Sequence, residues 1–437
     1  MEKTSADTLD ESSGQRSRSA SSVAGLALVF AAGRPSTIVC PAPARGVTLG
    51  RDWLASCSIE DERASRAHLR AQACAGGVEI TDLGSRNGTF VDGHRLERAT
   101  VARTNAVVRM GSTVLVVVDD CELFARHPTK LRDGRVEGPR TSAVTRDIAE
   151  IAAGSRTLLV LGESGVGKED AAREFHRRGP RSKGPFVAVN CAAVPESLAE
   201  RLFFGSKQGA FSGSTDAEGY VRAARGGTLF LDELGDLDAS LQSKLLRLVE
   251  SREILPVGAA RPEEVDLSIC AATNRDLRDD VARGRFREDL YFRLAEPAGR
   301  LPPLRQRREE IPWLVVEAAH KVDPSLSIGA KLVEACLLRA WPGNIRELIS
   351  ACAQAARRAR GEGQGALRID HLDALAGAPV AAPEAESSGD ARAARALPDD
   401  ATIASALESA QGNVSGAAKA LGMHRNQLRR WIERRRG

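Results

Sequence analysis

The pattern of apolar and polar positions divides the chain into segments of different kinds. From Val23 to Asp119, short apolar runs alternate with Gly and Asp turn signals, and no long amphipathic helix interrupts them. This pattern predicts an all-β sandwich. Its predicted strands are Gly25–Ala31, Gly46–Leu49, Val78–Thr81, Val107–Met110 and Val114–Val118.

After Thr141 the pattern changes to apolar runs that alternate with segments of helical period. Such alternation favours a parallel sheet covered by helices, which is an α/β fold. Residues 302–376 have helical spacing throughout, which predicts an all-α subdomain. The predicted α/β elements are the strands Thr157–Leu161, Phe186–Val189, Thr228–Leu231 and Leu267–Ala272 and a helix at Leu241–Glu250.

Polar and low-complexity segments separate these parts. Residues 1–22 lack apolar periodicity and predict a disordered tail. Polar sequence with Gly and Pro predicts linkers over 121–140 and 377–396. The expected fold class is therefore multidomain, with domains at 23–120 (all-β), 141–301 (α/β), 302–376 (all-α) and 397–437 (three short helices).

The positive charge of the chain is concentrated at its C-terminal end. With 62 Lys and Arg against 58 Asp and Glu, the net charge of the 437 residues is +4, too small by itself to indicate nucleic-acid binding. Residues 425–437 hold six Arg and one Glu, which sum to +5 and leave −1 for the other 424 residues. A hydrophobic content of 42% excludes wholesale disorder.

The eight cysteines are scattered, and the closest pairs are 16 or 17 positions apart, so the chain has no CxxC motif for a metal or for redox chemistry. Free thiols in a reducing, cytoplasmic compartment are expected. The apolar run Val23–Ala32 weakly resembles a signal peptide but is too short to span a bilayer. A buried first strand is the favoured interpretation, and no membrane contact is expected.

A glycine-rich loop follows the predicted strand Thr157–Leu161 and precedes a helix, which is the context that the G-x-x-x-x-G-K phosphate-binding motif requires. Backbone N–H groups of such a loop bind phosphate oxygens, and Lys168 supplies a charge for the β- and γ-phosphates. The alternative is a glycine-rich turn without a ligand. The candidate nucleotide-binding residues are Gly162, Glu163, Ser164, Gly165, Val166, Gly167, Lys168 and Glu169.

A second predicted strand ends in two acids, in the sequence Gly226-Gly-Thr-Leu-Phe-Leu-Asp-Glu233. A carboxylate at a strand end can hold Mg²⁺ through water, and the next can polarise the attacking water. These roles point to Asp232 and Glu233, respectively. The alternative, an acidic turn, is less favoured because a phosphate loop precedes it in the same alternating segment.

The phosphate loop, with Glu169 in place of the usual Ser or Thr, resembles that of the bacterial enhancer-binding proteins, which are AAA+ activators of sigma-54 RNA polymerase. Further segments resemble this family in its order from Gly162 to Leu348. They are Phe186-Val-Ala-Val-Asn-Cys191, Leu231-Asp-Glu-Leu-Gly-Asp236, Ala272-Thr-Asn-Arg-Asp-Leu277, Gly284-Arg-Phe-Arg-Glu-Asp-Leu290, Arg300-Leu-Pro-Pro-Leu-Arg305 and Trp341-Pro-Gly-Asn-Ile-Arg-Glu-Leu348.

The resemblance implies an ATPase with an α/β subdomain and a helical lid, with ATP and Mg²⁺ as cofactors, that assembles into a homo-oligomeric ring. It implies arginine fingers that reach the neighbouring subunit's site, where they stabilise transition-state charge. The implied roles are Asn190 as the switch asparagine, Thr273 and Asn274 as the first sensor, Arg287 and Arg293 as the fingers, and Arg346 as the second sensor.

Three segments depart from the family pattern. In the family, a surface loop with the sequence Gly-Ala-Phe-Thr-Gly-Ala contacts sigma-54. Here the corresponding loop has Ser in place of the Thr and of the final Ala, and its candidate sigma-54 contacts are Gly209, Ala210, Phe211, Ser212, Gly213 and Ser214. The preceding stretch, Leu202-Phe-Phe-Gly-Ser-Lys207, also differs, and Val136-Glu-Gly-Pro-Arg140 hardly resembles the adenine-side motif.

Loop residues of the predicted sandwich resemble a second family. Gly50-Arg51, Ser65-Arg-Ala-His68 and the run Asp82–Gly93 resemble a forkhead-associated (FHA) domain over about residues 25–119, which is a sandwich that binds phosphothreonine. The resemblance implies that Arg51 and Arg66 pair with the phosphate, Ser65 donates a hydroxyl and Asn87 holds the peptide backbone. His68 is expected to brace the loops. The alternative is a sandwich that has lost ligand binding.

The C-terminal segment has two apolar faces separated by Gly422, followed by a basic helix. A helix, a Gly turn and a basic helix predict a helix-turn-helix. This segment resembles the Fis-type domain of sigma-54 activators, although a solvated basic tail is the alternative. The candidate DNA contacts are Arg425, Asn426, Gln427 and Arg430.

Together, these features predict an ATP-hydrolysing activator that binds upstream DNA, forms a ring and remodels sigma-54 RNA polymerase when its FHA domain meets a partner phosphorylated by a Ser/Thr kinase. One alternative is a DNA-binding AAA+ regulator that no longer engages sigma-54, which the altered surface loop favours. The other is a phosphopeptide adaptor with a vestigial ATPase, which the intact Lys168, Asp232 and Glu233 disfavour.

Overall fold

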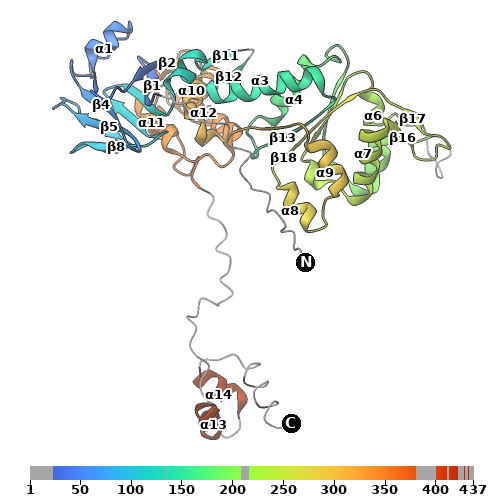
Figure 1. Ribbon diagram of the computed structural model, residues 1–437. Coiled ribbons are helices and arrows are strands. Elements are labelled where there is room, and N and C mark those ends of the chain that lie inside the picture. Colours follow the sequence, from blue (N-terminus) through green and yellow to red (C-terminus); the bar gives the residue numbers. More distant parts are fainter. Residues whose placement is uncertain are drawn as a thin grey trace, which may run out of the picture. The chain divides into compact units, whose positions relative to one another are not determined.

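The computed structural model describes residues 23–132, 134–207, 216–379, 400–410, 413–421, 428 and 432. The chain divides into two units, residues 1–379 and 380–437, which are considered separately below (Figure 1). No helix within the described ranges has the length and apolar character needed to cross a membrane. All eight cysteines are free thiols, as predicted.

Two antiparallel sheets form the N-terminal sandwich, with strand orders β2-β1-β10-β9-β6-β7 and β3-β4-β5-β8. The five predicted strands are present, as β1, β3, β5, β9 and β10. The strands β2, β4, β6, β7 and β8 and the helix α1 were not predicted. Of these, β6, β7 and β8 are only two or three residues long, and such short runs leave little periodic signal. The bounds are β1 Gly25–Ala31, β2 Arg34–Pro41, β3 Val47–Leu49, α1 Arg51–Ser56, β4 Leu69–Cys74, β5 Gly77–Asp82, β6 Thr89–Val91, β7 His94–Arg95, β8 Thr100–Ala102, β9 Val107–Met110 and β10 Thr113–Val118.

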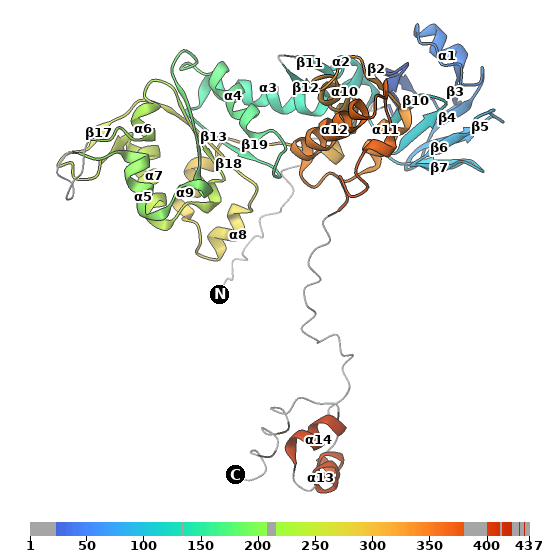
Figure 2. The same ribbon diagram turned by 180° about the vertical axis from the view of Figure 1, so that it is seen from behind.

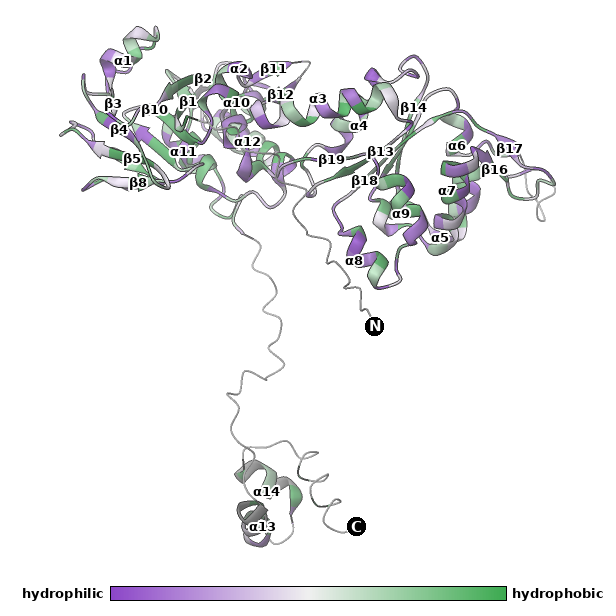
Figure 3. Cartoon of the chain, viewed as in Figure 1, coloured by the Kyte–Doolittle hydropathy of each residue, from purple (hydrophilic) through white to green (hydrophobic). Residues whose placement is uncertain are grey.

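Strands β1 and β10 are buried on both faces, which explains their unbroken apolar sequences (Figure 3). Successive side chains of a strand point to opposite faces. Leu26 and Leu28 therefore enter the core between the two sheets, whereas Ala27 and Val29 enter a cluster formed with the helices of residues 311–361. The sandwich thus shares a core with the lid.

The linker predicted over residues 121–140 is wrong, because most of this segment is regular structure. The Asp120 carboxylate accepts hydrogen bonds from the amides of Glu122 and Leu123 and so caps a short helix. Phe124, on that helix, is 2% exposed and joins the core shared with the lid. The elements are α2 Cys121–Arg126, β11 Lys130–Arg132, β12 Arg135–Glu137 and the start of α3 Pro139–Gly154.

A five-stranded parallel sheet, with the order β14-β15-β18-β13-β19, forms the α/β part. The four predicted strands are confirmed, whereas β19, only three residues long, was not predicted. Helices α3 and α4 pack on one face of the sheet, and α5, α7 and α9 pack on the other. The strands are β13 Thr157–Leu161, β14 Phe186–Asn190, β15 Thr228–Asp232, β18 Ser268–Thr273 and β19 Ala298–Arg300.

Short helices and a small hairpin complete this part. The helices are α4 Lys168–Arg178, η1 Cys191–Ala193, α5 Glu196–Phe204, α6 Tyr220–Ala223, η2 Leu234–Asp236, α7 Ala239–Ser251, α8 Leu277–Ala282 and α9 Glu288–Ala295. The hairpin strands are β16 Glu253–Ile254 and β17 Glu263–Glu264. Helix α7 confirms the predicted helix at Leu241–Glu250.

The lid lies between the sandwich and the parallel sheet in both views (Figures 1 and 2). It is helical, as predicted, apart from one short parallel strand pair. A buried ion pair of 2.6 Å joins Arg109 of β9 to Glu334 of α11. The lid elements are η3 Leu304–Gln306, η4 Arg308–Glu310, α10 Ile311–His320, β20 Ser327–Ile328, α11 Ala330–Leu338, α12 Asn344–Gly361, β21 Ala366–Leu367 and η5 Ile369–His371.

The C-terminal unit contains α13, Asp400–Ser409, and α14, Val414–Ala420. Ile403, Ala417 and Leu428 are buried in its own small core. The apolar faces predicted for two of its helices therefore meet one another. The residues predicted to contact DNA lie outside the described part of the chain.

Candidate functional site

The phosphate loop connects β13 to α4, at the carboxyl edge of the sheet, where ligands bind in open α/β folds. Gly165 and Gly167 have φ values of 71° and 103°, which side chains other than glycine adopt only with strain. Lys168 is the first residue of α4, and its side chain is 6% exposed. The loop therefore combines free backbone geometry, a helix N-terminus and a fixed cation, which together suit phosphate binding.

The Lys168 ammonium faces the carboxylate of Glu233, which follows β15; β18 lies between β15 and β13 in the sheet. Its Nζ lies 3.5 Å from Glu233 Oε1 and donates a hydrogen bond to Gly162 O at 3.2 Å. Glu233 has a φ of 53° and a ψ of 49°, a left-handed conformation that is uncommon outside glycine. Its amide donates to Asp232 Oδ1 at 3.0 Å. The turn thus aims the Glu233 carboxylate at the phosphate loop, with the Asp232 carboxylate beside it in the chain.

Strand register brings the other predicted polar residues to the same edge. Asn190 lies opposite Asp232, and Thr273 lies opposite Leu161, directly before the loop. The Gly162 amide donates to Thr273 O at 3.3 Å. Asn190 is exposed, and its Oδ1 accepts a hydrogen bond from the Ala192 amide at 3.0 Å, so this side chain caps η1. Asn274 follows Thr273 and is exposed.

The N-terminus of α12 docks on the loop. Arg346 Nη1 donates to Ser164 Oγ at 3.4 Å, and the Ile345 amide donates to Gly165 O at 3.0 Å. The buried Asn344, which sequence reasoning missed, donates to Ser164 O at 3.0 Å. The motif Trp341–Leu348 contains this residue, but spacing alone does not show which of its polar side chains turns inward.

Two further arginines hold the loop and were also missed. Arg305 pairs with both carboxylate oxygens of Glu163, at 2.7 and 2.8 Å. Arg307 is 2% exposed and donates to Val166 O at 2.6 Å. Arg305 is the last residue of the Arg300–Arg305 motif and Arg307 follows it closely, and that position was the available signal.

A cavity beside the loop is lined by both apolar and charged side chains. Val136 of β12 lines it, although the sequence around this residue hardly resembles the family motif expected there. Arg135 and Asp170, which also line the cavity, form an ion pair of 2.9 Å. The apolar side chains lining the cavity are Val136, Ile148, Val166, Ala171, Leu301 and Ile345.

Neither predicted arginine finger is directed at a phosphate loop in its own subunit. Arg287 is exposed and pairs with Asp289 at 2.7 Å. Arg293 is 63% exposed and pairs with Glu250 at 3.1 Å. Both guanidinium groups are thus exposed on the surface near α7 and α9.

The predicted phosphothreonine residues gather around the loop of residues 62–66. Arg51 donates to the backbone oxygens of Glu62 and Ala64, at 2.9 and 3.0 Å. Asn87 donates to Arg63 O at 2.7 Å, while Ser65 Oγ accepts from the Arg86 amide. Arg66 is exposed.

Buried polar side chains support this loop cluster. His68 is fully buried, its Nδ1 accepts from the Ser65 amide at 3.0 Å, and its Nε2 contacts Gly88 O at 3.2 Å. This confirms the predicted bracing role. Asp82 accepts hydrogen bonds from Ser85 and Thr89; although burial alone would raise the Asp82 pKa, these bonds lower it to about 2. The loop between Asp82 and Thr89 is therefore held by an ionised carboxylate.

Two predicted sites lie outside the described residues. They are the sigma-54 contacts Gly209–Ser214 and the DNA contacts Arg425, Asn426, Gln427 and Arg430.

Three protein families match successive parts of the chain. Residues 47–111 match the FHA domain, residues 136–298 match the sigma-54 interaction domain, and residues 400–434 match the bacterial regulatory proteins of the Fis family. The order agrees with the three folded parts of the structure.

Similar proteins include the sigma-54-dependent transcriptional regulator UacR of Escherichia coli (strain K12), 47% identical over 210 residues, or 46% of this chain and 36% of that protein. The transcriptional regulatory protein ZraR of Klebsiella oxytoca is 39% identical over 298 residues, or 67% of this chain and 66% of that protein. The chain thus spans less than two thirds of either relative.

Among solved structures, NtrX of Brucella abortus in complex with ATP is similar with a TM-score of 0.50 and 28% identity, over 67% of each chain. The phosphate loop and the acidic strand end lie within the matched sigma-54 interaction domain, and the lid residues that contact the loop lie after it in the chain. The chain therefore belongs to the family of sigma-54-dependent transcriptional regulators, with an FHA domain before its AAA+ domain and a Fis-type segment after it.

Proposed function

We propose that this chain hydrolyses ATP and uses the energy to activate transcription by sigma-54 RNA polymerase. The observation that carries the proposal is the contact of Lys168 with Glu233, 3.5 Å apart at the phosphate loop. Phosphate oxygens would compete for Lys168 and release Glu233, which then orients the attacking water. The NtrX structure that contains ATP supports the same ligand here.

Asp232 is the residue that would hold Mg²⁺. This cation keeps several waters and binds through one or two carboxylates together with substrate phosphates, so a single carboxylate beside the loop suits it. When bound, Mg²⁺ neutralises the charge that develops on the phosphates. Thr273 and Asn274 would face the γ-phosphate from the adjacent strand, and Asn190 would pair with Glu233 in one nucleotide state.

The lid residues are proposed to report which nucleotide is present. Arg346 already reaches Ser164, and the cavity lined by Val136 and Ile345 would take the adenine ring between apolar walls. Arg287 and Arg293 would enter the site of a neighbouring subunit in a ring. Their exposed positions, directly before α9 and on it, support a role in trans.

Substitution of the water-orienting carboxylate tests this assignment. Glu233→Gln removes the charge with little change in size, so ATP hydrolysis should fall by about 10²-fold or more because general-base catalysis contributes this much. Binding of ATP and of DNA should persist. Glu264→Gln, an exposed surface acid, serves as the control and should hydrolyse ATP like the wild type. Undiminished turnover by Glu233→Gln would refute the assignment.

The C-terminal unit is proposed to bind upstream DNA, and the loop of residues 209–214 to contact sigma-54. A second candidate function is an ATP-hydrolysing, DNA-binding regulator that no longer engages sigma-54. Ser212 and Ser214 favour it, because they replace the Thr and Ala of the family loop. Open-complex formation with sigma-54 polymerase and ATP separates the two, since the second candidate predicts ATPase activity without open complexes.

We also propose that the FHA domain binds a protein phosphorylated on threonine by a Ser/Thr kinase. Arg51 now donates to two neutral backbone oxygens, and a phosphate dianion would be a stronger acceptor for the same guanidinium. Ser65 and Arg66 lie on the adjoining loop, with Asn87 beside it to hold the peptide. The lysine–carboxylate contact at the phosphate loop argues against a vestigial ATPase that serves only as an adaptor.

Calorimetric titration with a degenerate phosphothreonine peptide pool and its unphosphorylated counterpart tests the sensing role. Only the phosphorylated pool should bind, and Arg51→Ala should weaken binding by about tenfold or more, since a hydrogen bond to a charged group contributes roughly 1.5–3 kcal/mol. Arg70→Ala, an exposed arginine of β4, is the matched control. Equal binding of both pools, or normal binding by Arg51→Ala, would show that the domain does not read phosphate.

A further inference from the structure

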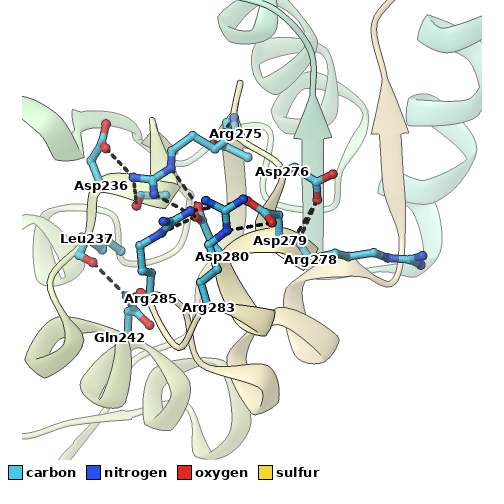
Figure 4. Close-up of polar contacts among 12 residues, drawn as sticks. Asp236, Leu237, Gln242, Arg275, Asp276, Arg278, Asp279, Asp280, Arg283 and Arg285 are labelled. Atoms are coloured by element: carbon cyan, nitrogen blue, oxygen red, sulfur yellow. Dashed lines mark hydrogen bonds and ion pairs between the residues drawn. The ribbon is translucent and has the colours of Figure 1, made fainter. Parts of the chain in front are cut away.

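Two chains of polar contacts join the turn after Glu233 to the segment that carries Arg287 (Figure 4). The turn comprises η2 and Leu237, and the segment runs from Arg285 to Arg287, directly before α9. Each series of contacts lies within a single polypeptide. The function proposed above assigns no role to the side chains between them.

The first chain is ionic. Arg275 Nη1 donates to Gly235 O at 2.8 Å and to Asp236 Oδ1 at 3.0 Å, and its Nη2 donates to Asp280 Oδ1 at 2.9 Å. Arg285 Nε donates to the same Asp280 oxygen at 2.8 Å. One carboxylate, with a side chain only 3% exposed, is therefore shared by two guanidinium groups.

Backbone hydrogen bonds to Asp280 also join it to the segment that carries Arg287. The Asp280 carbonyl accepts hydrogen bonds from the amides of Arg285 at 2.8 Å and Phe286 at 3.2 Å. Burial alone would raise the Asp280 pKa, but hydrogen bonds from Arg275 and Arg285 lower it, so the carboxylate is ionised at neutral pH. Loss of its charge would leave both guanidinium groups without their buried partner.

The second chain runs through one buried amide. Gln242 is 1% exposed, and its Nε2 donates to Leu237 O at 2.9 Å and to Arg285 O at 3.1 Å. Its Oε1 accepts from the Arg287 amide at 2.9 Å. Gln242 therefore holds the backbone of Arg287 against the end of the turn.

We propose that Asp280 and Gln242 are positioning residues. They couple the position of Arg287 to the conformation of the turn that follows Glu233. This inference rests on the proposed function, in which Arg287 enters the neighbouring subunit's site. The turn follows Asp232 and Glu233 directly, so a change in one site would move the arginine that is offered to the next. Each subunit would thereby pass its nucleotide state around the ring.

The variant Asp280→Asn keeps the side-chain size and removes the charge. We expect kcat for ATP to fall by about tenfold to a hundredfold, because a misplacement of about 1 Å can cost about 10²-fold. The KM for ATP should stay within about twofold, since the variant's own nucleotide contacts remain. Arg283→Ala is the matched control, because Arg283 pairs with Asp279 at 3.0 Å in an exposed ion pair and should leave both constants unchanged.

Mixing variants separates a positioning role from a structural one. A Glu233→Gln chain cannot hydrolyse ATP but keeps Arg287 in place, whereas an Asp280→Asn chain has an intact site of its own and a misplaced Arg287. In an equal mixture, Arg287 of a Glu233→Gln chain can serve the intact site of an Asp280→Asn chain. The ATPase activity of the mixture should therefore be at least about fivefold higher than the mean of the activities of the two variants measured separately. Absence of recovery would overturn the inference.

A mixture of Arg287→Ala and Glu233→Gln chains is the reference. If this reference does not recover, the trans role of Arg287 in the proposed function is wrong, and the inference falls with it. If the reference recovers and the Asp280→Asn mixture does not, only the inference is wrong. Should Asp280→Asn fail to fold, Arg285→Ala carries the same test, since the Arg285 side chain is 46% exposed.

Discussion

At the scale of single residues, the nucleotide site depends on backbone conformations that few residue types adopt. Glu233 and Asn344 have φ values of 53° and 52°, and Gly165 has 71°. The backbones of Glu233 and Asn344 adopt this left-handed conformation because the contacts of their side chains hold them there. Such strain costs about 1–3 kcal/mol per residue and is typical of functional sites.

The variant Gly165→Ala should weaken ATP binding. A Cβ at this position would lie 2.3 Å from Gly343 O and 3.0 Å from Arg346 Cβ, so the lid must move away from the loop. We expect the Kd for ATP, measured by titration, to rise about tenfold or more, the equivalent of about 1.4 kcal/mol. Gly226→Ala controls for backbone strain alone, because Gly226 has a φ of 73° with no atom within 4 Å of its added Cβ. An equal effect of both variants would contradict the steric explanation.

At the scale of elements, the junction of η4 with α10 links the phosphate loop to the lid. Arg307 pairs with Glu310 at 3.1 Å while it holds Val166 O, and both side chains are almost fully buried. Beside them, Glu309 is 2% exposed, and its Oε1 has no hydrogen-bond partner. Burial and the neighbouring Glu310 raise the pKa of Glu309 to about 8.

The raised pKa predicts that Glu309→Gln stabilises the protein at neutral pH. The folded state must keep Glu309 protonated, whereas the unfolded chain ionises it above its ordinary pKa of 4.5. The stability that protonated Glu309 allows is therefore complete below about pH 4.5 and is lost as the pH rises to about 8. The free energy of unfolding of the variant should exceed that of the wild type by on the order of 3 kcal/mol at pH 7, and this difference should shrink toward pH 4. Thermal unfolding at several pH values measures it. A constant difference across this range would argue against Glu309 as the titrating group.

At the scale of the whole molecule, the described residues between 23 and 379 form one compact unit, in which the sandwich and the lid share a core. Arg109 lies 3.9 Å above the Phe90 ring and pairs with Glu334 of the lid. From the other direction, Arg308 donates to Asn105 O at 2.7 Å. The FHA domain is thus joined to the element that covers the ATP site.

The variant Glu334→Ala should destabilise sandwich and lid together. It leaves the Arg109 guanidinium buried without its partner, and breaking a buried ion pair costs about 3–5 kcal/mol. We expect a lower melting temperature with a single transition in calorimetry. Glu317→Ala removes the half-buried partner of the exposed Lys321 and should change stability by less than about 1 kcal/mol. Separate transitions for the two parts in the wild type would contradict the shared core.

Much of this molecule could be predicted from the sequence because its signals are local. The runs Gly25–Ala31 and Thr157–Leu161 are strands with the predicted bounds, since an apolar run between turn residues carries its own signal. The phosphate loop was found because its glycines and Lys168 are adjacent in sequence. The linker predicted at 121–140 failed because its signals were only the capping Asp120 and three scattered core residues, Cys121, Phe124 and Val136.

The sequence by itself determined the order of the three parts, the phosphate loop and the acidic strand end, because motif spacing survives without knowledge of long-range contacts. Only the tertiary structure decided what faces these motifs. It placed Lys168 against Glu233, docked Asn344 on the loop and buried Asp280 between two arginines. These contacts join residues far apart in the chain or select one of several nearby charges, and no local period encodes that choice. The same reason hid the second buried face of β1 and β10, which only the lid explains.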